Sequence, residues 1–534
     1  MKKQTFLKGS VILMASAVAA KLLAALFRIP LTNMLGGVGM SCFSCAYSLF
    51  MPVYALIVTG ISSAVARMTA SSAALGMYAN ARRIRRVALI IFTAAGLPAG
   101  ALMAALAVPF SVYSVGSTDA AAAVAMIAPA VVFSCITAVE RGYYEGLSNM
   151  YPTAVSQVVE GIVKAAAGLW LCGYVTENGE QLAGYFPWIG DVRALAAAAG
   201  ILGVTLSTAG AALYFAVLRF FAKAPEETEK ALESRREIAR QLVREALPVG
   251  AGAVVTNLSA LIDMWTIIGL ISRSGAYTGR FEGVADGEVP QFVYGSFSGI
   301  ALTVFNLVPS VTNMLGKGAL TCIASAKGCG SPEALRRSST QALLTAAVIA
   351  VPAAVGLGVM APEVLELLFS RQSDEVGVCI SSLRLLMPAM LCLCMSYPLF
   401  SMLQAVGRAS APLKIMLAGT AVKLVGNLLL IPFIGVDGAA VSTSVSYAFI
   451  LAASLRCYFR ETGAVPDKLP FLGVLYAGTM CGGAAYVAED LFGKSPAARL
   501  AAAAIAGGGV YFAVLWTVLG RKVFALRKSS FNKK

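Results

Sequence analysis

The stretch "GSVILMASAVAAKLLAALFRI" (Gly9–Ile29) decides the fold class, because at 1.5 Å per residue a helix of this length crosses about 30 Å of hydrocarbon. Basic residues precede it, and "ASAVAA" (Ala15–Ala20) resembles the small-residue cleavage site of a secretion signal. The apolar run nevertheless continues past that site to its last isoleucine. We therefore interpret it as a retained first transmembrane helix.

The composition extends this interpretation to the whole chain. Of its 534 residues, 58% are hydrophobic and only 13% are charged, far from the balance of a soluble protein. Apolar segments of spanning length recur at 9–29, 41–66, 87–110, 120–145, 151–173, 193–221, 246–272, 292–325, 339–360, 378–403, 411–433, 437–459, 470–489 and 497–520. We expect an all-α polytopic membrane protein with about 14 transmembrane helices.

The charged residues between these segments predict the orientation of the chain. Lysine and arginine cluster at the N-terminus, in alternate loops and in the C-terminal tail, and acidic residues occupy the other loops. The positive-inside rule then places both termini in the cytoplasm. The net charge of +15 comes from these clusters, which lack the aromatic interleaving of a single-strand nucleic-acid site. We expect no nucleic-acid partner.

Weak internal similarity divides the chain into two halves. "GILGVTLSTA" (Gly200–Ala209) and "GVDGAAVSTS" (Gly435–Ser444) share spaced glycines and a Ser-Thr pair, and Pro52 and Pro309 each lie in the second helix of a half. Six helices per half is an even number, so the halves form a parallel repeat. The predicted parts are an N-terminal six-helix lobe (1–222), a cytoplasmic amphipathic linker helix (223–245), a C-terminal six-helix lobe (246–460), and two additional helices with a basic cytoplasmic tail (461–534).

The linker carries a basic stripe, with Arg236, Arg240 and Arg244 recurring every four residues. One interpretation is an interfacial helix that touches anionic lipid headgroups. The other is a hinge between the two halves.

Several kinds of chemistry are missing from the sequence. The chain has no histidine, which removes the commonest general base and metal ligand. Its single CxxC (Cys42, Cys45) lies inside a predicted span without partner ligands, and no GxxxxGK[ST] loop occurs. We predict a transporter and not an enzyme, with no cofactor or metal. Its energy would come from a Na⁺ or H⁺ gradient or from the membrane potential.

Charged residues inside the predicted spans mark the candidate site, because each costs about 3 kcal/mol at mid-membrane and so faces a cavity or a partner. Lys21 and Arg28 are seven residues apart and share one helix face. Glu160 and Lys164 are four apart and can pair. The further candidates for substrate binding are Arg67, Asp263, Lys317, Arg384 and Lys423.

Each candidate also has a structural interpretation. Arg28 and Arg384 can extend to the nearer interface, and Arg67 and Arg141 can anchor cytoplasmic helix ends. Asp263, together with a nearby asparagine, can bind a cation or form a salt bridge to a basic residue of the first helix. The excess of cations over acids predicts a central cavity suited to a polyanion.

Two motifs carry a family resemblance. "KLLAALFRIPLTNMLGGVGM" (Lys21–Met40) and "RGYYEGLSNMYPTAVSQVVEGIVKAAAG" (Arg141–Gly168) resemble signatures of the stage V sporulation protein B family. That family, with the MurJ-type lipid II flippases, belongs to the multidrug/oligosaccharidyl-lipid/polysaccharide exporter superfamily. The resemblance covers essentially the whole chain.

The resemblance implies a flippase of the bacterial cell membrane. Its substrate would be a lipid-linked peptidoglycan precursor of the undecaprenyl-pyrophosphate-linked, lipid II type, moved by alternating access through a cationic cavity between the lobes. Lys21 and Arg28 would engage the pyrophosphate, whereas Arg141 and Pro152 would be partly structural. MurJ-type relatives place further arginines near the positions of Pro52 and Pro309, and this chain does not, so the sporulation branch is the better match.

Three alternatives remain at this point. The chain could export another undecaprenyl-linked polysaccharide, work as a multidrug/cation antiporter on the same fold, or act as a scaffold that transports nothing. The partners expected for the leading hypothesis are the lipid-linked glycan, membrane lipids and cell-wall synthesis enzymes, and we expect a monomer.

Overall fold

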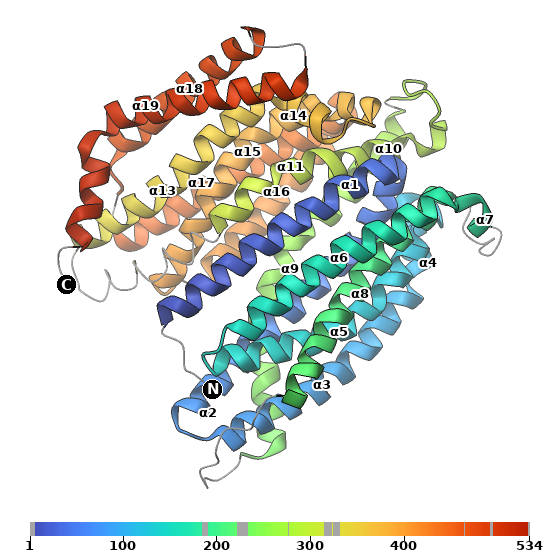
Figure 1. Cartoon of the computed structure of the whole chain (residues 1–534), viewed down its shortest axis with the longest axis vertical. Helices are drawn as coiled ribbons and strands as arrows, with labels where there is room; N and C mark the ends of the chain where they lie inside the picture. Colours follow the sequence, from blue (N-terminus) through green and yellow to red (C-terminus); the bar gives the residue numbers. More distant parts are fainter. Residues whose placement is uncertain are drawn as a thin grey trace. The chain divides into compact units, whose positions relative to one another are not determined.

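The computed structural model describes residues 6–183, 191–221, 233–275, 277–313, 323, 332–408, 410–463, 465–491 and 495–531. These residues form helices joined by short connections, and no strand occurs among them. The chain divides into two compact units, Met1–Gly299 and Ile300–Lys534, which Figure 1 colours blue to green and green to red. The lobe boundaries drawn from the internal repeat are a different division and stay a prediction.

Unit 1 begins with α1 (Phe6–Ala55), the π-helix η1 (Leu56–Ile61), α2 (Ser62–Ala74), α3 (Tyr78–Ala105), α4 (Ala107–Val115), α5 (Ala121–Gly146) and α6 (Tyr151–Glu177). It continues with α7 (Gly179–Ala183), α8 (Val192–Phe221), α9 (Arg235–Ser274), the 3₁₀-helix η2 (Asp286–Glu288), α10 (Val289–Ser296) and most of the π-helix η3 (Phe297–Ala301). Within this unit α3, α5, α8 and α6 run side by side (Figure 1).

Unit 2 contains α11 (Leu302–Phe305), α13 (Pro332–Val359), α14 (Ala361–Leu368), α15 (Ser373–Ala405), α16 (Ala411–Ile434), α17 (Val436–Thr462), α18 (Lys468–Leu491) and α19 (Pro496–Phe531). Helix α15 packs against α13 and α17, and α17 also packs against α16. Helix α18 packs against both α13 and α19.

The described residues contain 11 helices long and apolar enough to cross a membrane, or 12 if the bent pair Asp286–Phe305 and Leu307–Asn313 is one span. One of them, Val18–Ala74, has 57 residues, about 85 Å of helix and therefore enough for two crossings. It bends at Gly36, whose φ of 64° lies in the left-handed region that glycine adopts without strain. The prediction of an all-α polytopic membrane protein is confirmed.

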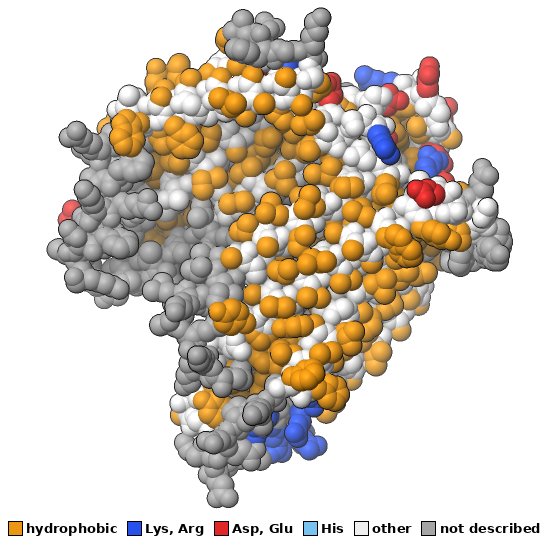
Figure 2. Space-filling view, viewed as in Figure 1, with side chains coloured by type: hydrophobic (Ala, Val, Ile, Leu, Met, Phe, Trp, Pro, Cys, Tyr) orange, Lys and Arg blue, Asp and Glu red, His pale blue; other side chains and the backbone are white. Residues whose placement is uncertain are grey.

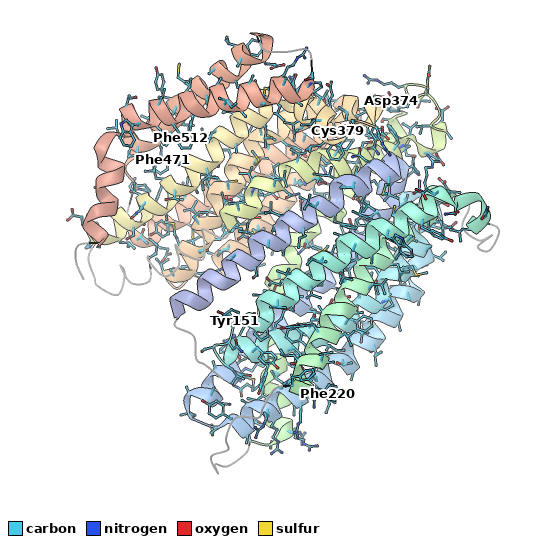
Figure 3. All side chains as sticks on the ribbon, in the orientation of Figure 1. Tyr151, Phe220, Asp374, Cys379, Phe471 and Phe512 are labelled. Carbon is cyan, nitrogen blue, oxygen red and sulfur yellow. The ribbon has the colours of Figure 1, made fainter. Side chains whose placement is uncertain are left out.

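Surface composition agrees with membrane insertion. Figure 2 shows hydrophobic side chains over the visible face of unit 1, with basic side chains at the end where α2 and α3 meet. Tyr151 and Phe220, 58% and 89% exposed, lie toward the same end of unit 1 (Figure 3). Exposed aromatic side chains near helix ends are typical of a membrane–water interface.

The repeated glycine motif has the same structural effect in both units. A Cβ on Gly203 of α8 would lie 2.2 Å from the backbone of Gly168 in α6, and one on Gly438 of α17 would lie 2.7 Å from the backbone of α16. Only glycine allows such an approach, so each copy packs its helix closely against the preceding long one.

Helix α9 joins two predicted elements. It begins at Arg235, where Oγ of Ser234 accepts the backbone N–H of Glu237 at 3.1 Å, the signature of a capping box. The helix then continues for 40 residues and includes the predicted span 246–272. The basic stripe of the predicted linker therefore lies on the same helix as a predicted transmembrane segment.

Candidate functional site

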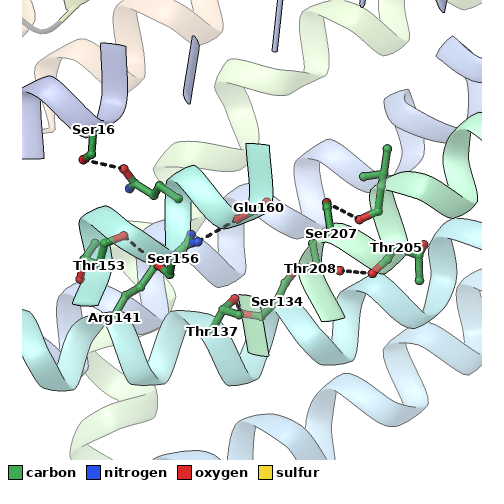
Figure 4. Close-up of polar contacts among 12 residues, drawn as sticks. Ser16, Ser134, Thr137, Arg141, Thr153, Ser156, Glu160, Thr205, Ser207 and Thr208 are labelled. Atoms are coloured by element: carbon green, nitrogen blue, oxygen red, sulfur yellow. Dashed lines mark hydrogen bonds and ion pairs between the residues drawn. The ribbon is translucent and has the colours of Figure 1, made fainter. Parts of the chain in front are cut away.

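A buried ion pair joins α5 to α6. Nη2 of Arg141 donates to Oε2 of Glu160 at 2.8 Å, and Nε of Arg141 donates to Oγ of Ser156 at 2.9 Å (Figure 4). The Tyr54 hydroxyl on α1 is a further hydrogen-bond partner of Arg141, whose side chain is only 6% exposed. We call Tyr54, Arg141, Ser156 and Glu160 the Arg141 cluster. Its one cation and one carboxylate balance each other.

This cluster corrects the pairing expected from the sequence. Glu160 forms its ion pair with Arg141, and the ammonium of Lys164 donates to the Tyr47 hydroxyl on α1. Lys164 stays within electrostatic range of Glu160, one turn away. The planar guanidinium reaches the carboxylate and a hydroxyl at once, a geometry that a point-charge ammonium does not offer.

Lys21 of α1 lies within electrostatic range of Lys164. The two ammonium groups repel each other across the contact between α1 and α6. The helices are close here, since a Cβ on Gly161 would lie 2.8 Å from the Leu23 side chain. We call Lys21 and Lys164 the lysine pair. Two like charges inside a membrane span leave a positive potential that an anion would offset.

Arg28, on the same helix as Lys21, has a different environment. Its Nη2 donates to the carbonyl of Ser298 at 3.0 Å, and its guanidinium lies 5.9 Å from the centre of the Phe43 ring. The hydroxyl of Thr32, one turn away, donates to the carbonyl of Gly299 at 3.4 Å. Both carbonyls belong to η3, where a π-helix interrupts the regular ladder. Arg28 and Thr32 thus each bind a backbone oxygen at a helix irregularity.

Asp263 of α9 lies in the interior of unit 1 and is 3% exposed. It is within electrostatic range of Tyr294, whose hydroxyl is hydrogen-bonded to Ser48. The side-chain amide of Asn257, proposed as its partner in a cation site, donates to the carbonyl of Ala253 at 2.9 Å. In the described part of the chain, no group of three or more His, Cys, Asp or Glu side chains could hold a metal ion.

The remaining predicted cations have local partners or lie elsewhere. Arg67 of α2 forms an exposed ion pair with Glu245 of α9 at 3.3 Å. In unit 2, Nε of Arg384 donates to the carbonyl of Gly358 at 3.3 Å, and Lys423 of α16 is 4% exposed. Lys317 lies outside the described residues.

The three singled-out prolines lie where helices start or change. Pro152 occupies the first turn of α6, where its missing N–H costs nothing. Pro52 precedes the π-helix η1 by one turn. Pro309 follows the 44° break between Phe305 and Leu307. Pro52 and Pro309 each remove a backbone donor beside a local departure from a regular helix.

Sequence reasoning missed the two tyrosines that join the charges. Tyr47 and Tyr54 are seven residues apart on α1, and with Phe43 and Phe50 they form a row of rings whose neighbouring centroids are 5.0 to 6.4 Å apart. Their spacing was visible in the sequence. An aromatic row with two hydroxyls, opposite a helix bearing Glu160 and Lys164, is the signal that could have found them.

Two family models match the chain. Residues 6–321 match the model described as "Polysaccharide biosynthesis protein", and residues 301–522 match the one described as "Lipid II flippase MurJ".

Three relatives from Bacillus subtilis (strain 168) align with most of the chain. "Stage V sporulation protein B" is 24% identical over 446 residues, which is 83% of this chain and 81% of the relative. "Lipid II flippase MurJ" is 21% identical over 471 residues, 86% of this chain and 83% of the relative. "Uncharacterized membrane protein YabM" is 23% identical over 478 residues, 88% and 82% respectively.

Solved structures share the fold. "Lipid II flippase MurJ, inward closed conformation" matches with a TM-score of 0.69 at 14% identity, covering 96% of this chain and all of that one. The inward-facing conformation of a multidrug resistance MATE family transporter of the MOP superfamily matches with a TM-score of 0.64 at 15% identity, covering 83% of this chain and 93% of that one. At such low identity these matches show the fold alone.

Proposed function

Because the chain belongs to the family described as "Polysaccharide biosynthesis protein", whose model matches more than half of it, we propose that it is a flippase for a lipid-linked peptidoglycan precursor. The substrate would be an undecaprenyl-pyrophosphate-linked, lipid II type molecule, carried from the inner to the outer leaflet. The relatives named as a lipid II flippase and as a sporulation protein support this choice and suggest a role in sporulation.

The observation that carries the proposal is the lysine pair. Lys21 and Lys164 bring two positive charges to the contact between α1 and α6, where the Glu160 carboxylate also pairs with Arg141. A pyrophosphate bears the opposite charge and would offset the two positive charges by accepting hydrogen bonds from both ammonium groups. Such charge-assisted hydrogen bonds contribute about 1.5–3 kcal/mol each.

The Tyr47 hydroxyl supports the same role. It accepts from the Lys164 ammonium and so fixes the direction of that side chain. A lysine held by one hydrogen bond keeps two further N–H donors for a ligand. The role of Lys317, Arg384 and Lys423 as further contacts, and that of a Na⁺ or H⁺ gradient or the membrane potential as the driving force, stay parts of this proposal.

A second candidate substrate is another undecaprenyl-linked glycan, which the broader description of the matching family favours. The lysine pair does not distinguish the two substrates, because both carry a pyrophosphate or phosphate next to the lipid. Selectivity between the two substrates must therefore come from contacts with their sugar and peptide portions.

Reconstitution tests the proposal. Proteoliposomes with fluorescent lipid II in both leaflets would be treated with a membrane-impermeant quencher, and we expect the protein to expose the protected half of the signal. The Lys21→Ala/Lys164→Ala variant should slow this step at least about tenfold, the effect of losing one charge-assisted contact. Lys414→Ala, which removes an exposed lysine of α16, is the matched control.

Two results would contradict the proposal. No translocation by the wild-type protein, with an undecaprenyl-linked glycan of another type moved instead, would replace the substrate. Unchanged translocation by the double variant would remove the lysine pair from the binding site while leaving the flippase function intact.

A further inference from the structure

An apolar pocket of about 280 Å³ lies in unit 1, between η1, α3, α5 and α9. Leu56 of η1, Phe92 and Ala95 of α3, Cys135 of α5 and Leu247 of α9 are among its lining residues, and all the others are apolar as well. The volume is nearly twice that of a cavity that holds one benzene molecule, about 150 Å³. It is therefore large enough for a segment of hydrocarbon chain longer than a benzene molecule.

The pocket opens on a face that meets lipid. Leu247 is 55% exposed, and the side chains of Ala95 and Ala99 at the rim are exposed too. Around them on α3, Ile90 and Leu97 are 68% and 58% exposed. Because α3 is a membrane-spanning helix, these side chains lie in hydrocarbon. Water is a poor occupant, since the lining offers it no hydrogen-bond partners.

One wall of the pocket is held rigidly. A Cβ on Gly60 of η1 would lie 2.6 Å from the carbonyl oxygen of Ala246, and one on Gly250 of α9 would lie 2.7 Å from that of Leu56. The two backbones are therefore in direct contact beside the pocket. A small shift of α9 toward η1 therefore cannot close the space.

Basic residues lie at the end of the pocket that is predicted to be cytoplasmic. Arg240, Val243 and Leu247 follow each other at spacings of three and four residues, so the arginine lies on the pocket-lining face of α9, one turn before the lining begins. Arg244 of α9 and Arg86 of α3 are exposed at the same end, and none of the three arginines forms an ion pair with a described residue.

We propose that this pocket binds one acyl chain of an anionic phospholipid of the cytoplasmic leaflet, with the phosphate among these arginines. The apolar lining selects a hydrocarbon chain, and the arginines select a negative headgroup at the depth where the chain ends. A neutral lipid lacks the second interaction, and a soluble anion lacks the first. The site is separate from the lysine pair and does not depend on which substrate the protein moves.

Native mass spectrometry of the full-length protein in detergent tests this inference, with phosphatidylglycerol as the probe. We expect one tightly retained molecule per chain and at least tenfold weaker binding of phosphatidylcholine. Ala95→Trp, which fills the pocket, should weaken phosphatidylglycerol binding at least tenfold. Leu97→Trp adds the same side chain to the same helix outside the lining and should leave binding unchanged.

Two further variants test whether the arginines are needed to bind the lipid phosphate. Arg240→Gln/Arg244→Gln should weaken phosphatidylglycerol binding about thirtyfold, because each of the two basic residues near a membrane surface contributes about 1 kcal/mol. Arg273→Gln changes an exposed arginine at the opposite end of α9 and is the control. Equal affinity for phosphatidylcholine, or preferential binding of undecaprenyl phosphate over phosphatidylglycerol, would overturn the proposal.

A measurement on the unaltered protein covers the case in which Ala95→Trp fails to fold. Phosphatidylglycerol with a photoreactive diazirine on one acyl chain should crosslink to segments 91–99 and 243–247, and unlabelled phosphatidylglycerol should compete. Crosslinks spread evenly over the lipid-facing surfaces of α3, α6 and α8, without competition, would show that the pocket holds no specific lipid and would overturn the proposal.

Discussion

The Arg141 cluster and the lysine pair meet on α6, where Glu160 and Lys164 are one turn apart, and they differ in their balance of charge. Arg141 has a carboxylate at 2.8 Å and hydroxyl partners from two helices. Lys164 has one hydroxyl partner, lies within electrostatic range of the Glu160 carboxylate that pairs with Arg141, and has a second lysine, Lys21, as a neighbour. The first arrangement is complete without a ligand, and the second gains from an anion.

This difference distinguishes charged residues that stabilise the fold from charged residues that bind a ligand better than a count of the cations does. A buried charge whose partner is removed costs several kcal/mol, so the Arg141 cluster holds α1, α5 and α6 together. Lys21 and Lys164 bring two cations to a region whose Glu160 carboxylate is already paired with Arg141, so an anion that binds there offsets an excess of positive charge. An excess of cations over carboxylates can thus mark residues that bind an anionic ligand.

The largest expected effect on stability comes from breaking the Arg141 cluster. Arg141→Met should destabilise unit 1 by about 3–5 kcal/mol, because the buried Glu160 carboxylate loses its countercharge. Thermal unfolding in detergent, followed by the loss of monodisperse protein, measures this. The paired variant Arg141→Met/Glu160→Met removes both charges and should recover most of the loss. A single variant as stable as wild type would show that the pair is not structural.

A charge reversal sharpens the comparison. Lys21→Glu turns the lysine pair into an ion pair with Lys164, which should leave stability unchanged or raise it by up to about 1 kcal/mol. Translocation of lipid II should fall at least about tenfold, since the added carboxylate competes with the substrate anion. Parallel flipping and unfolding assays separate the two effects. Retained flipping would mean that no anion enters between these helices.

The sequence predicted that Lys21 and Arg28 share a role because they share a helix face. Periodicity predicts which face a residue occupies, but it does not predict the neighbours that the residue meets in the fold. Seven residues place two side chains on one face and about 10 Å apart along the axis. At that separation Lys21 meets α6 and Arg28 meets η3, and only the tertiary packing decides which neighbour each one has. Apolar segments are a local signal, and they placed most of the membrane-spanning helices.

The Glu160 pairing has the same explanation. Spacing of four residues makes Lys164 a possible partner, but the Arg141 guanidinium arrives from α5 with better geometry. A contact between residues 19 positions apart across a turn depends on how α5 and α6 pack. The tyrosines of α1 were overlooked because aromatic residues in a membrane helix are ordinary packing residues unless their hydroxyl partners are known.

Arg28→Gln should have a smaller effect than either change above. The side chain loses a charged hydrogen bond to the Ser298 carbonyl, about 1.5 kcal/mol, while the amide can still donate there. Hydrogen exchange of segment 295–302 should become faster as the π-helix loosens, with little change around the Arg141 cluster. Lys8→Gln, a basic residue of the same helix nearer its start, is the control. Unchanged exchange in 295–302 would show that η3 does not depend on Arg28.

The smallest effect is expected for Arg67, whose ion pair with Glu245 lies at the surface with the arginine side chain 58% exposed. Exposed pairs contribute about 0–1 kcal/mol and are screened by salt. Arg67→Ala should therefore lower the unfolding temperature slightly at low salt and not at high salt, with lipid II translocation within about twofold of wild type. A large, salt-independent loss of translocation would instead place Arg67 with the lysine pair as a substrate contact, because only a desolvated charge escapes screening.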